Sequence, residues 1–256
     1  MSFRVEMEQT ARTRKSNIIL ALDLPFEKPE NKEKLLSKAI EILEATHPYV
    51  CAVKFNRHLT LPLGIFNGVQ QLLKRVHDEG LLAIMDCKVN DMGATNQTIA
   101  QYYYAAGFDA LTANPFVGWN EGLKPVFNIA HELKRGVILL TYMSHRGAGE
   151  GYGQTVLDPK TGGKTSQYIV FARKALKWNA DGVVVGATYP EKIREIHEIL
   201  GEKIPIYSPG IGVQGGTVKS ALKTGARYLI VGRAITLSEN PAETARKIRD
   251  MAKSEE

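Results

Sequence analysis

The chain has 256 residues, of which 44% are hydrophobic and 23% are charged, and it carries a formal charge of +6. These values are typical of one folded domain of the size of an α/β barrel. No apolar run reaches the roughly 18 residues of a membrane span, and the start lacks the apolar centre of a secretion signal, so we expect a cytoplasmic protein without a membrane partner.

The positive charge is spread along predicted helices, where Lys and Arg alternate with Glu, as in Lys32-Glu33-Lys34. That pattern is typical of solvated helix faces and disfavours a nucleic-acid partner. A small phosphorylated anion as ligand explains the surplus of positive charge better.

Eight short runs rich in β-forming residues follow one another along the chain. Most are continuously apolar, which is typical of strands buried on both faces of a parallel sheet. The predicted strands are Ile18–Asp23, Val50–Phe55, Leu81–Asp86, Ala110–Ala113, Gly136–Thr141, Gly182–Val185, Ile204–Tyr207 and Tyr228–Val231.

Amphipathic stretches of helical length lie between and after these runs. They are Lys32–Ala45, Gly64–Glu79, Ala94–Ala106, Tyr168–Trp178, Glu191–Leu200, Thr217–Thr224 and Pro241–Lys253. The alternation predicts a single (β/α)8 TIM barrel domain over residues 1–256, with an extra N-terminal helix in residues 1–15 across the barrel bottom. The glycine-rich segment Tyr142–Thr165 predicts a long mobile loop over the site.

Two cysteines, Cys51 and Cys87, are too few for a disulfide framework. Each is opposite in phase to the nearby lysine, Lys54 or Lys88, within its predicted strand. We therefore expect both thiols to face the surrounding helices as small apolar side chains, without a catalytic role.

Polar residues recur at the C-terminal ends of the predicted strands, the end at which TIM barrels carry their active sites. They are Asp23, Lys54, Asp86, Lys88, Ser144, Ser208-Pro209-Gly210 and Gly232-Arg233. This repetition at one end predicts a single site built from several strands.

The segment Asp86-Cys87-Lys88-Val89-Asn90-Asp91 places an ammonium between two carboxylates. Alternation puts Asp86 and Lys88 on one side of the strand, and Asp91 could reach the Lys88 of its own or of a neighbouring chain. Nearby carboxylates favour the protonated amine, which suits proton delivery and opposes a Schiff base. Asp86 and Asp91 could also bind a divalent metal, but Lys88 and Lys54 are unfavourable neighbours for a cation.

The loops after strands seven and eight predict a phosphate site, because TIM barrels commonly bind phosphate there. The glycines of Ser208–Gly216 allow backbone N–H groups to approach an anion, and a helix N-terminus follows. Arg233 adds a guanidinium that can bind phosphate through two hydrogen bonds.

These residues resemble one family, the orotidine 5′-phosphate decarboxylases of single-domain microbial type. The resemblance covers nearly the whole chain and is carried by Ala21-Leu22-Asp23, Val53-Lys54-Phe55, the D-x-K-x-x-D of Asp86–Asp91 with Thr95-Asn96, Met143-Ser144-His145, Ser208-Pro209-Gly210 with Gln214-Gly215-Gly216, and Val231-Gly232-Arg233. It implies cofactor-free and metal-free decarboxylation of orotidine 5′-phosphate to uridine 5′-phosphate in pyrimidine biosynthesis.

The resemblance also implies a role for each residue of the site. Lys88 would protonate C6 of the pyrimidine, and Asp86 would lie against the substrate carboxylate. Asp91 and Thr95 would come from the partner subunit of a homodimer. The remaining substrate contacts would be Asp23 and Lys54 to ribose, Ser144 to the pyrimidine, and Pro209, Gln214, Gly232 and Arg233 at the phosphate.

Two other functions compete with this one. D-x-K-x-x-D also occurs in metal-dependent sugar-phosphate decarboxylases and aldolases of the same superfamily, but these need a second acidic ligand near the end of strand two, where this chain has Lys54. A non-catalytic nucleotide-phosphate-binding protein is the other alternative. Such a protein would have no use for the proton donor between Asp86 and Asp91.

Overall fold

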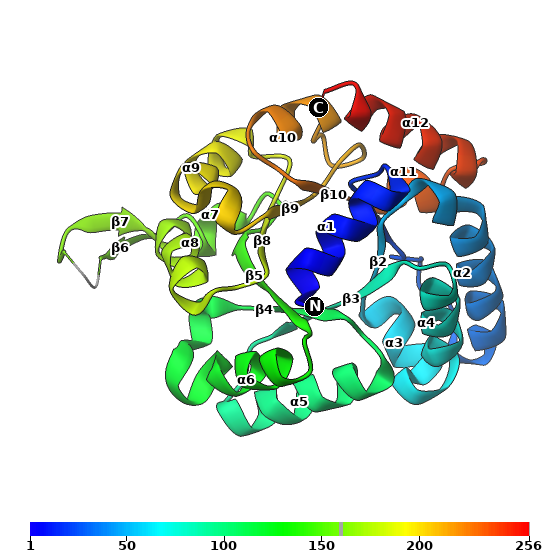
Figure 1. Cartoon of the computed structure of the whole chain (residues 1–256), viewed down its shortest axis with the longest axis horizontal. Coiled ribbons are helices and arrows are strands. Elements are labelled where there is room, and N and C mark those ends of the chain that lie inside the picture. The colour runs from blue at the N-terminus through cyan, green and yellow to red at the C-terminus, as the bar shows by residue number, and fades with distance from the viewer. Residues whose placement is uncertain (159–160, 256) are drawn as a thin grey trace.

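The computed structural model describes residues 1–158 and 161–255, and in them eight parallel strands close into a barrel in the order β1-β10-β9-β8-β5-β4-β3-β2 (Figure 1). These strands are β1 (Ile18–Ala21), β2 (Ala52–Phe55), β3 (Leu82–Val89), β4 (Ala110–Ala113), β5 (Gly136–Tyr142), β8 (Gly182–Val185), β9 (Ile206–Pro209) and β10 (Tyr228–Val231). Each overlaps one predicted run, and the predicted TIM barrel is confirmed.

Helices surround the barrel as an outer ring (Figure 1). They are α2 (Lys32–Thr46), α3 (Arg57–Leu63), α4 (Val69–Asp78), α5 (Gly93–Ala106), α6 (Lys124–Glu132), α7 (Ala148–Gly151), α8 (Gln167–Trp178), α9 (Pro190–Leu200), α10 (Val218–Lys223), α11 (Arg233–Thr236) and α12 (Pro241–Lys253). No helix of the described residues is long and apolar enough to cross a membrane.

Several helices differ from the sequence prediction. The predicted helix Gly64–Glu79 begins late, because Gly64 has a φ of +70° and Asn67 is not helical, so regular α-helix starts only at Val69. No predicted helical stretch corresponds to α3, α6, α7 or α11.

The core has two layers that follow the alternation of side chains along each strand. On β1, Ile18 and Leu20 pack outward against the helices, whereas Ile19 and Ala21 pack inside the barrel. This double burial explains why the strands are apolar at nearly every position.

Helix α1 (Phe3–Arg14) crosses the barrel at the N-terminal ends of its strands (Figure 1). Phe3 and Met7 are fully buried in the inner layer of the core. Gly136 opens β5 directly beneath the Phe3 ring, and a Cβ atom there would lie 2.2 Å from that ring. The helix therefore covers this end of the barrel, and the opposite end carries the polar strand ends.

The prediction for the two cysteines is correct for one of them. Cys87 packs in the outer layer, as expected, but Cys51 belongs to the inner layer with Phe3. The reason is that β2 begins only at Ala52, so Cys51 precedes the regular alternation. Burial raises the pKa of both thiols to about 12, which keeps them protonated at neutral pH.

The predicted position of Tyr142–Thr165 over the site is wrong. After α7 the segment forms an antiparallel hairpin of β6 (Thr155–Leu157) and β7 (Lys164–Ser166), which projects beyond the ring of helices beside α8 (Figure 1). The ring of Tyr142 packs edge-on against Tyr168 at the base of this projection. Of the described residues of the segment, only Met143 and Ser144 line the cavity described below.

Candidate active site

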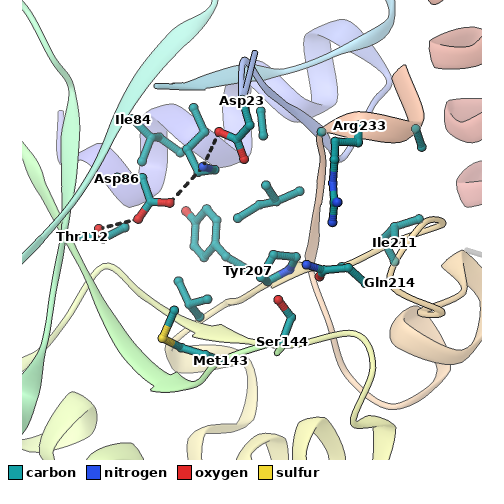
Figure 2. A pocket seen from close by; sticks show the side chains of 18 of the residues that line it. Asp23, Ile84, Asp86, Thr112, Met143, Ser144, Tyr207, Ile211, Gln214 and Arg233 are labelled. Carbon is teal, nitrogen blue, oxygen red and sulfur yellow. Dashed lines mark hydrogen bonds and ion pairs between the residues drawn. The ribbon is translucent and has the colours of Figure 1, made fainter. Parts of the chain in front are cut away.

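A cavity of about 240 Å³ opens at the C-terminal ends of the barrel strands (Figure 2). Nine of the eleven residues predicted for the site line it: Asp23, Lys54, Asp86, Lys88, Ser144, Pro209, Gln214, Gly232 and Arg233. The structure therefore brings together residues from six strands of the barrel or from the turns that follow them. Asp91 and Thr95 do not line this cavity.

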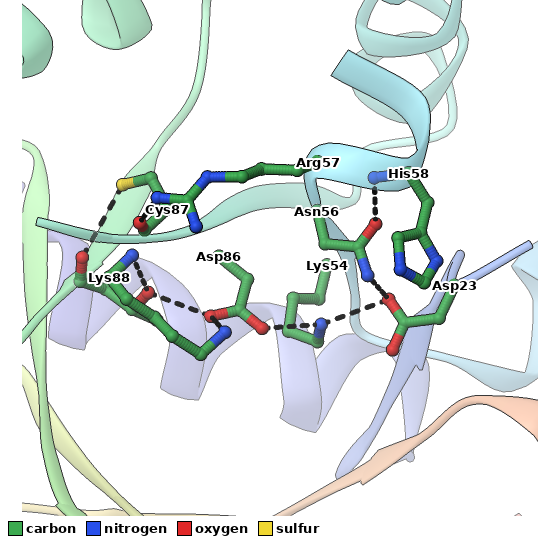
Figure 3. Close-up of polar contacts among 9 residues, drawn as sticks. Asp23, Lys54, Asn56, Arg57, His58, Asp86, Cys87 and Lys88 are labelled. Carbon is green, nitrogen blue, oxygen red and sulfur yellow. Dashed lines mark hydrogen bonds and ion pairs between the residues drawn. The ribbon is translucent and has the colours of Figure 1, made fainter. Parts of the chain in front are cut away.

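Four of these side chains form a row of alternating charge (Figure 3). The Lys54 Nζ atom lies 3.3 Å from Asp23 Oδ1 and 2.9 Å from Asp86 Oδ2. On the other side of Asp86, the Lys88 Nζ atom lies 2.7 Å from Oδ1. The side chains of Lys54 and Asp86 are 7% and 15% exposed, so their attraction acts in a poorly solvated environment.

The charge row shifts the protonation equilibria of its members. Burial alone would raise the pKa of Asp86, but the ammonium groups of Lys54 and Lys88 outweigh burial and hold that pKa well below its ordinary value. Burial alone would lower the pKa of Lys54, but Asp86 and Asp23 outweigh it and raise that pKa. Asp86 is therefore a carboxylate and Lys54 an ammonium at neutral pH.

A bulge in β3 aims Lys88 into the cavity. Met85 pairs with Leu111 and Val89 pairs with Ala113, so three residues of β3 lie opposite the single residue Thr112 of β4. Lys88 takes a left-handed backbone conformation with a φ of +50°, which is uncommon for a residue with a side chain. Asp86 and Lys88 share a side, as predicted, but a bulge rather than regular alternation produces the arrangement.

The opposite wall of the cavity consists of turns that follow β5, β9 and β10. Ser144 and Gln214 project into this side of the cavity from the turns after β5 and β9, and Arg233 projects into it from the start of α11, just after β10 (Figure 2). Gly210, with a φ of +100°, packs between two of them: a Cβ atom there would lie 2.8 Å from Gln214 Oε1 and 3.1 Å from Ser144 Cβ. Gln214 and Arg233 are exposed.

Asp91 and Thr95 lie outside the cavity and are exposed. The Asp91 carboxylate accepts a hydrogen bond from the Met92 amide at 2.7 Å, and the Asn96 amide group donates to the Asp91 backbone carbonyl at 2.5 Å. Among the described residues, Lys88 forms its ion pair with Asp86 and none with Asp91.

Comparison with known proteins identifies the family. Residues 16–248 match the Orotidine 5′-phosphate decarboxylase / HUMPS family. The chain is 36% identical to the orotidine 5′-phosphate decarboxylase of Pyrococcus abyssi over 93% of this chain and 100% of that protein. It is 35% identical to the enzyme of Methanosarcina barkeri, over 92% of this chain and 94% of that protein.

The chain belongs to this family. Solved structures of orotidine 5′-monophosphate decarboxylases share the barrel. One is the Methanocaldococcus jannaschii enzyme complexed with the inhibitor BMP, with a TM-score of 0.75 and 32% identity, covering 92% of this chain and 97% of that one. Another is the Pyrococcus horikoshii enzyme, with a TM-score of 0.74 and 34% identity over 92% and 99% of the two chains. The family and fold predicted from the sequence are confirmed.

Sequence reasoning missed two residues that organise the site in this family member. The Asn56 Nδ2 atom donates to Asp23 Oδ1 at 2.6 Å, while its Oδ1 accepts from the His58 amide and caps α3. The position of Asn56 between a strand and a helix predicts a helix cap, but it does not indicate the contact with Asp23. Thr112 bonds to Asp86 and to the Lys88 backbone. It lies within an apolar run, so nothing in the sequence marked it.

Proposed function

We propose that this family member converts orotidine 5′-phosphate to uridine 5′-phosphate without a cofactor, with Lys88 as the proton donor. The family and the names of its relatives support this reaction of pyrimidine biosynthesis, which is the activity expected from the sequence. The observation that carries the assignment of Lys88 is its ammonium, which lies at the cavity 2.7 Å from the ionised Asp86.

The chemistry requires a proton at one carbon atom. When the bond between C6 and the carboxylate breaks, carbon dioxide leaves and the electron pair stays on C6. The Lys88 ammonium then gives a proton to C6, and the resulting amine regains a proton from solvent. An ammonium fixed beside the carbon also stabilises the negative charge that develops there before the proton arrives.

The other charged residues prepare this step. Asp86, which remains ionised because of Lys54 and Lys88, lies against the substrate carboxylate and repels it. Loss of carbon dioxide removes that repulsion, so the repulsion raises the energy of the bound substrate more than that of the transition state. Asp23 and Lys54 bind the ribose hydroxyls.

The turns of the opposite wall bind the two remaining parts of the nucleotide. Ser144 contacts the pyrimidine, and Gln214 and Arg233 bind the phosphate together with the backbone at Pro209 and Gly232. The exposed guanidinium of Arg233 forms no ion pair within the described residues, so it is available to an anion. Binding energy from the phosphate, remote from C6, positions the reacting group.

The site is completed by a second copy of the chain in a homodimer. Asp91 and Thr95 are exposed and do not line their own cavity, and exposed apolar side chains occur on α3, α5 and the turns beside them. These are Leu61, Phe66, Met92 and Tyr102, which are between 45% and 76% exposed. Burying such a patch against its symmetry mate would bring Asp91 and Thr95 to the partner's Lys88.

The dimer can be tested by mixing two inactive variants, Lys88→Ala and Asp91→Ala. In a mixed dimer, one site takes its lysine from one chain and its aspartate from the other and is intact, while the second site lacks both. Random exchange should therefore restore about one quarter of the wild-type activity per site. A mixture that exchanges subunits but stays inactive would contradict a shared site.

The first measurement is the ultraviolet absorbance of orotidine 5′-phosphate with the purified protein and excess EDTA. Loss of the orotate band, with uridine 5′-phosphate as product, is expected. An unchanged orotate band with folded protein would instead make sugar phosphates with magnesium the next assay, although the ammonium of Lys54 between Asp23 and Asp86 opposes a cation there. Binding of the nucleotide without turnover would identify a non-catalytic binding protein.

A further inference from the structure

Thr112 on β4 is the residue that joins the bulge of β3 to the charge row. The residue is 2% exposed and lines the cavity beside Asp86 (Figure 2). The Thr112 Oγ1 atom lies 2.9 Å from Asp86 Oδ1 and 3.0 Å from the Lys88 backbone nitrogen. One hydroxyl therefore contacts both the carboxylate and the backbone of the proposed proton donor.

The directions of these two hydrogen bonds follow from the groups involved. The Lys88 amide can only donate, so Thr112 Oγ1 accepts from it. The single hydroxyl proton is then free to point at Asp86. The ammonium groups of Lys54 and Lys88 outweigh burial and keep the pKa of Asp86 low, so its carboxylate is ionised and can only accept. The result is a relay of fixed direction from the Lys88 amide through Thr112 to Asp86.

We propose that Thr112 is a positioning residue for the decarboxylation: it holds Asp86 in place and stabilises the left-handed backbone of Lys88. This inference rests on the proposed function of the site. In the resting site Asp86 Oδ1 accepts from both Lys88 Nζ and Thr112, whereas Oδ2 accepts from Lys54. When the Lys88 ammonium gives its proton to C6, Thr112 remains as the donor to Oδ1, so the carboxylate keeps its orientation.

The same hydroxyl stabilises the conformation of the bulge. A bulge leaves backbone groups without a partner in the sheet, and the Lys88 amide is such a group. Without the Thr112 acceptor that amide would be unsatisfied, and Lys88 would lose a contact that favours its φ of +50°. A shift of the backbone at this residue would move the ammonium away from C6.

The test is the substitution Thr112→Val, which keeps the branched shape and removes the hydroxyl. We expect kcat for orotidine 5′-phosphate to fall on the order of 10- to 100-fold, as is usual for loss of a hydrogen bond to a charged group. The dissociation constant of uridine 5′-phosphate should change less than about twofold, because binding of the product involves no proton transfer from Lys88. Thr112→Ser, which retains the hydroxyl, should recover most of kcat.

Thr141→Val is the matched control. Thr141 is a fully buried residue of β5, and its hydroxyl has no hydrogen-bond partner among the described residues. The same change there should leave kcat and product affinity unchanged. If Thr112→Val does not fold, Thr112→Ala carries the same prediction with a smaller side chain.

The outcomes separate this inference from the proposed function. Wild-type kcat in Thr112→Val would overturn the role of Thr112 while leaving the decarboxylase intact. An equal loss in Thr112→Ser and Thr112→Val, or a parallel loss of product affinity, would show a packing role instead and would also overturn it. An inactive wild-type protein would contradict the proposed function itself.

Discussion

The two walls of the active site are built differently. The wall formed by β1 to β4 has side chains that already hold one another: Lys54 bridges Asp23 and Asp86, and Thr112 secures the bulge. The wall formed by the turns after β5, β9 and β10 has exposed Gln214 and Arg233 and depends on glycines such as Gly210.

This difference separates the chemistry from the capture of the substrate. Proton transfer depends on distances of tenths of an ångström, so its groups are fixed by strands and by charges of opposite sign before the substrate arrives. In the proposed mechanism, exposed groups of the turns bind the phosphate, which displaces water from them. We call the wall formed by β1 to β4 the strand wall and the wall formed by the turns the turn wall. Substitutions in the strand wall are expected to reduce kcat. Substitutions in the turn wall are expected to reduce activity only when the substrate carries its phosphate.

The largest effect should come from Lys88→Ala. Removing the ammonium takes away both the proton donor and the positive charge at C6, so kcat should fall by at least about 10⁴-fold. The control is Lys38→Ala, which removes an exposed lysine of α2. The absorbance assay measures both variants, and circular dichroism checks that the fold is retained. Appreciable turnover by Lys88→Ala would contradict the mechanism.

A smaller loss is expected from Arg233→Ala, on the order of 100-fold in kcat/KM, because a charge-assisted contact to phosphate is lost. Orotidine, which lacks the phosphate, sharpens the test: the variant and the wild type should turn it over equally slowly. Arg194→Ala, an exposed arginine on α9, is the control. An equal loss of kcat/KM with orotidine would show that Arg233 does not act by binding the phosphate.

The last prediction concerns stability instead of catalysis. Asp86→Asn leaves the buried Lys54 ammonium with only Asp23, which should lower the free energy of unfolding by about 3 kcal/mol near pH 7. Because folding lowers the pKa of Asp86 from 3.8, the stabilisation by its charge is complete above pH 3.8 and is lost as the pH falls further.

Urea unfolding of both proteins across this pH range checks the prediction. The difference in free energy between wild type and Asp86→Asn should be constant from about pH 7 to pH 5 and should shrink below about pH 4. Asp78→Asn, which breaks an exposed ion pair with Lys74, should cost less than about 0.5 kcal/mol. A difference that grows towards acid pH would contradict the sign of the Asp86 shift.

The residues of both the strand wall and the turn wall can be predicted from the sequence. Continuous apolar runs located all eight strands, and polar residues at their ends located nine residues of the cavity. Strand ends were less accurate: β3 was expected to end at Asp86 but continues to Val89, because the bulge allows pairing to resume. A polar residue in a sequence looks like the end of a strand even when it lies inside one.

Features that depend on contacts between distant segments could not be predicted. Thr112 acquires its role only through the register of β4 against the bulge of β3. Glycines indicate freedom of the backbone but not its direction, so the sequence does not predict that the hairpin of β6 and β7 projects away from the cavity. Cys51 was misplaced because its layer depends on where β2 begins.

The bulge has a consequence for protein design. The D-x-K-x-x-D motif is contiguous in sequence and looks transferable to the third strand of any TIM barrel. In this molecule, however, the lysine conformation requires an acceptor on the neighbouring strand, opposite the three-residue segment. The smallest unit that can be transplanted is therefore a pair of adjacent strands in fixed register, and a barrel that received the motif alone would acquire the charges without their geometry.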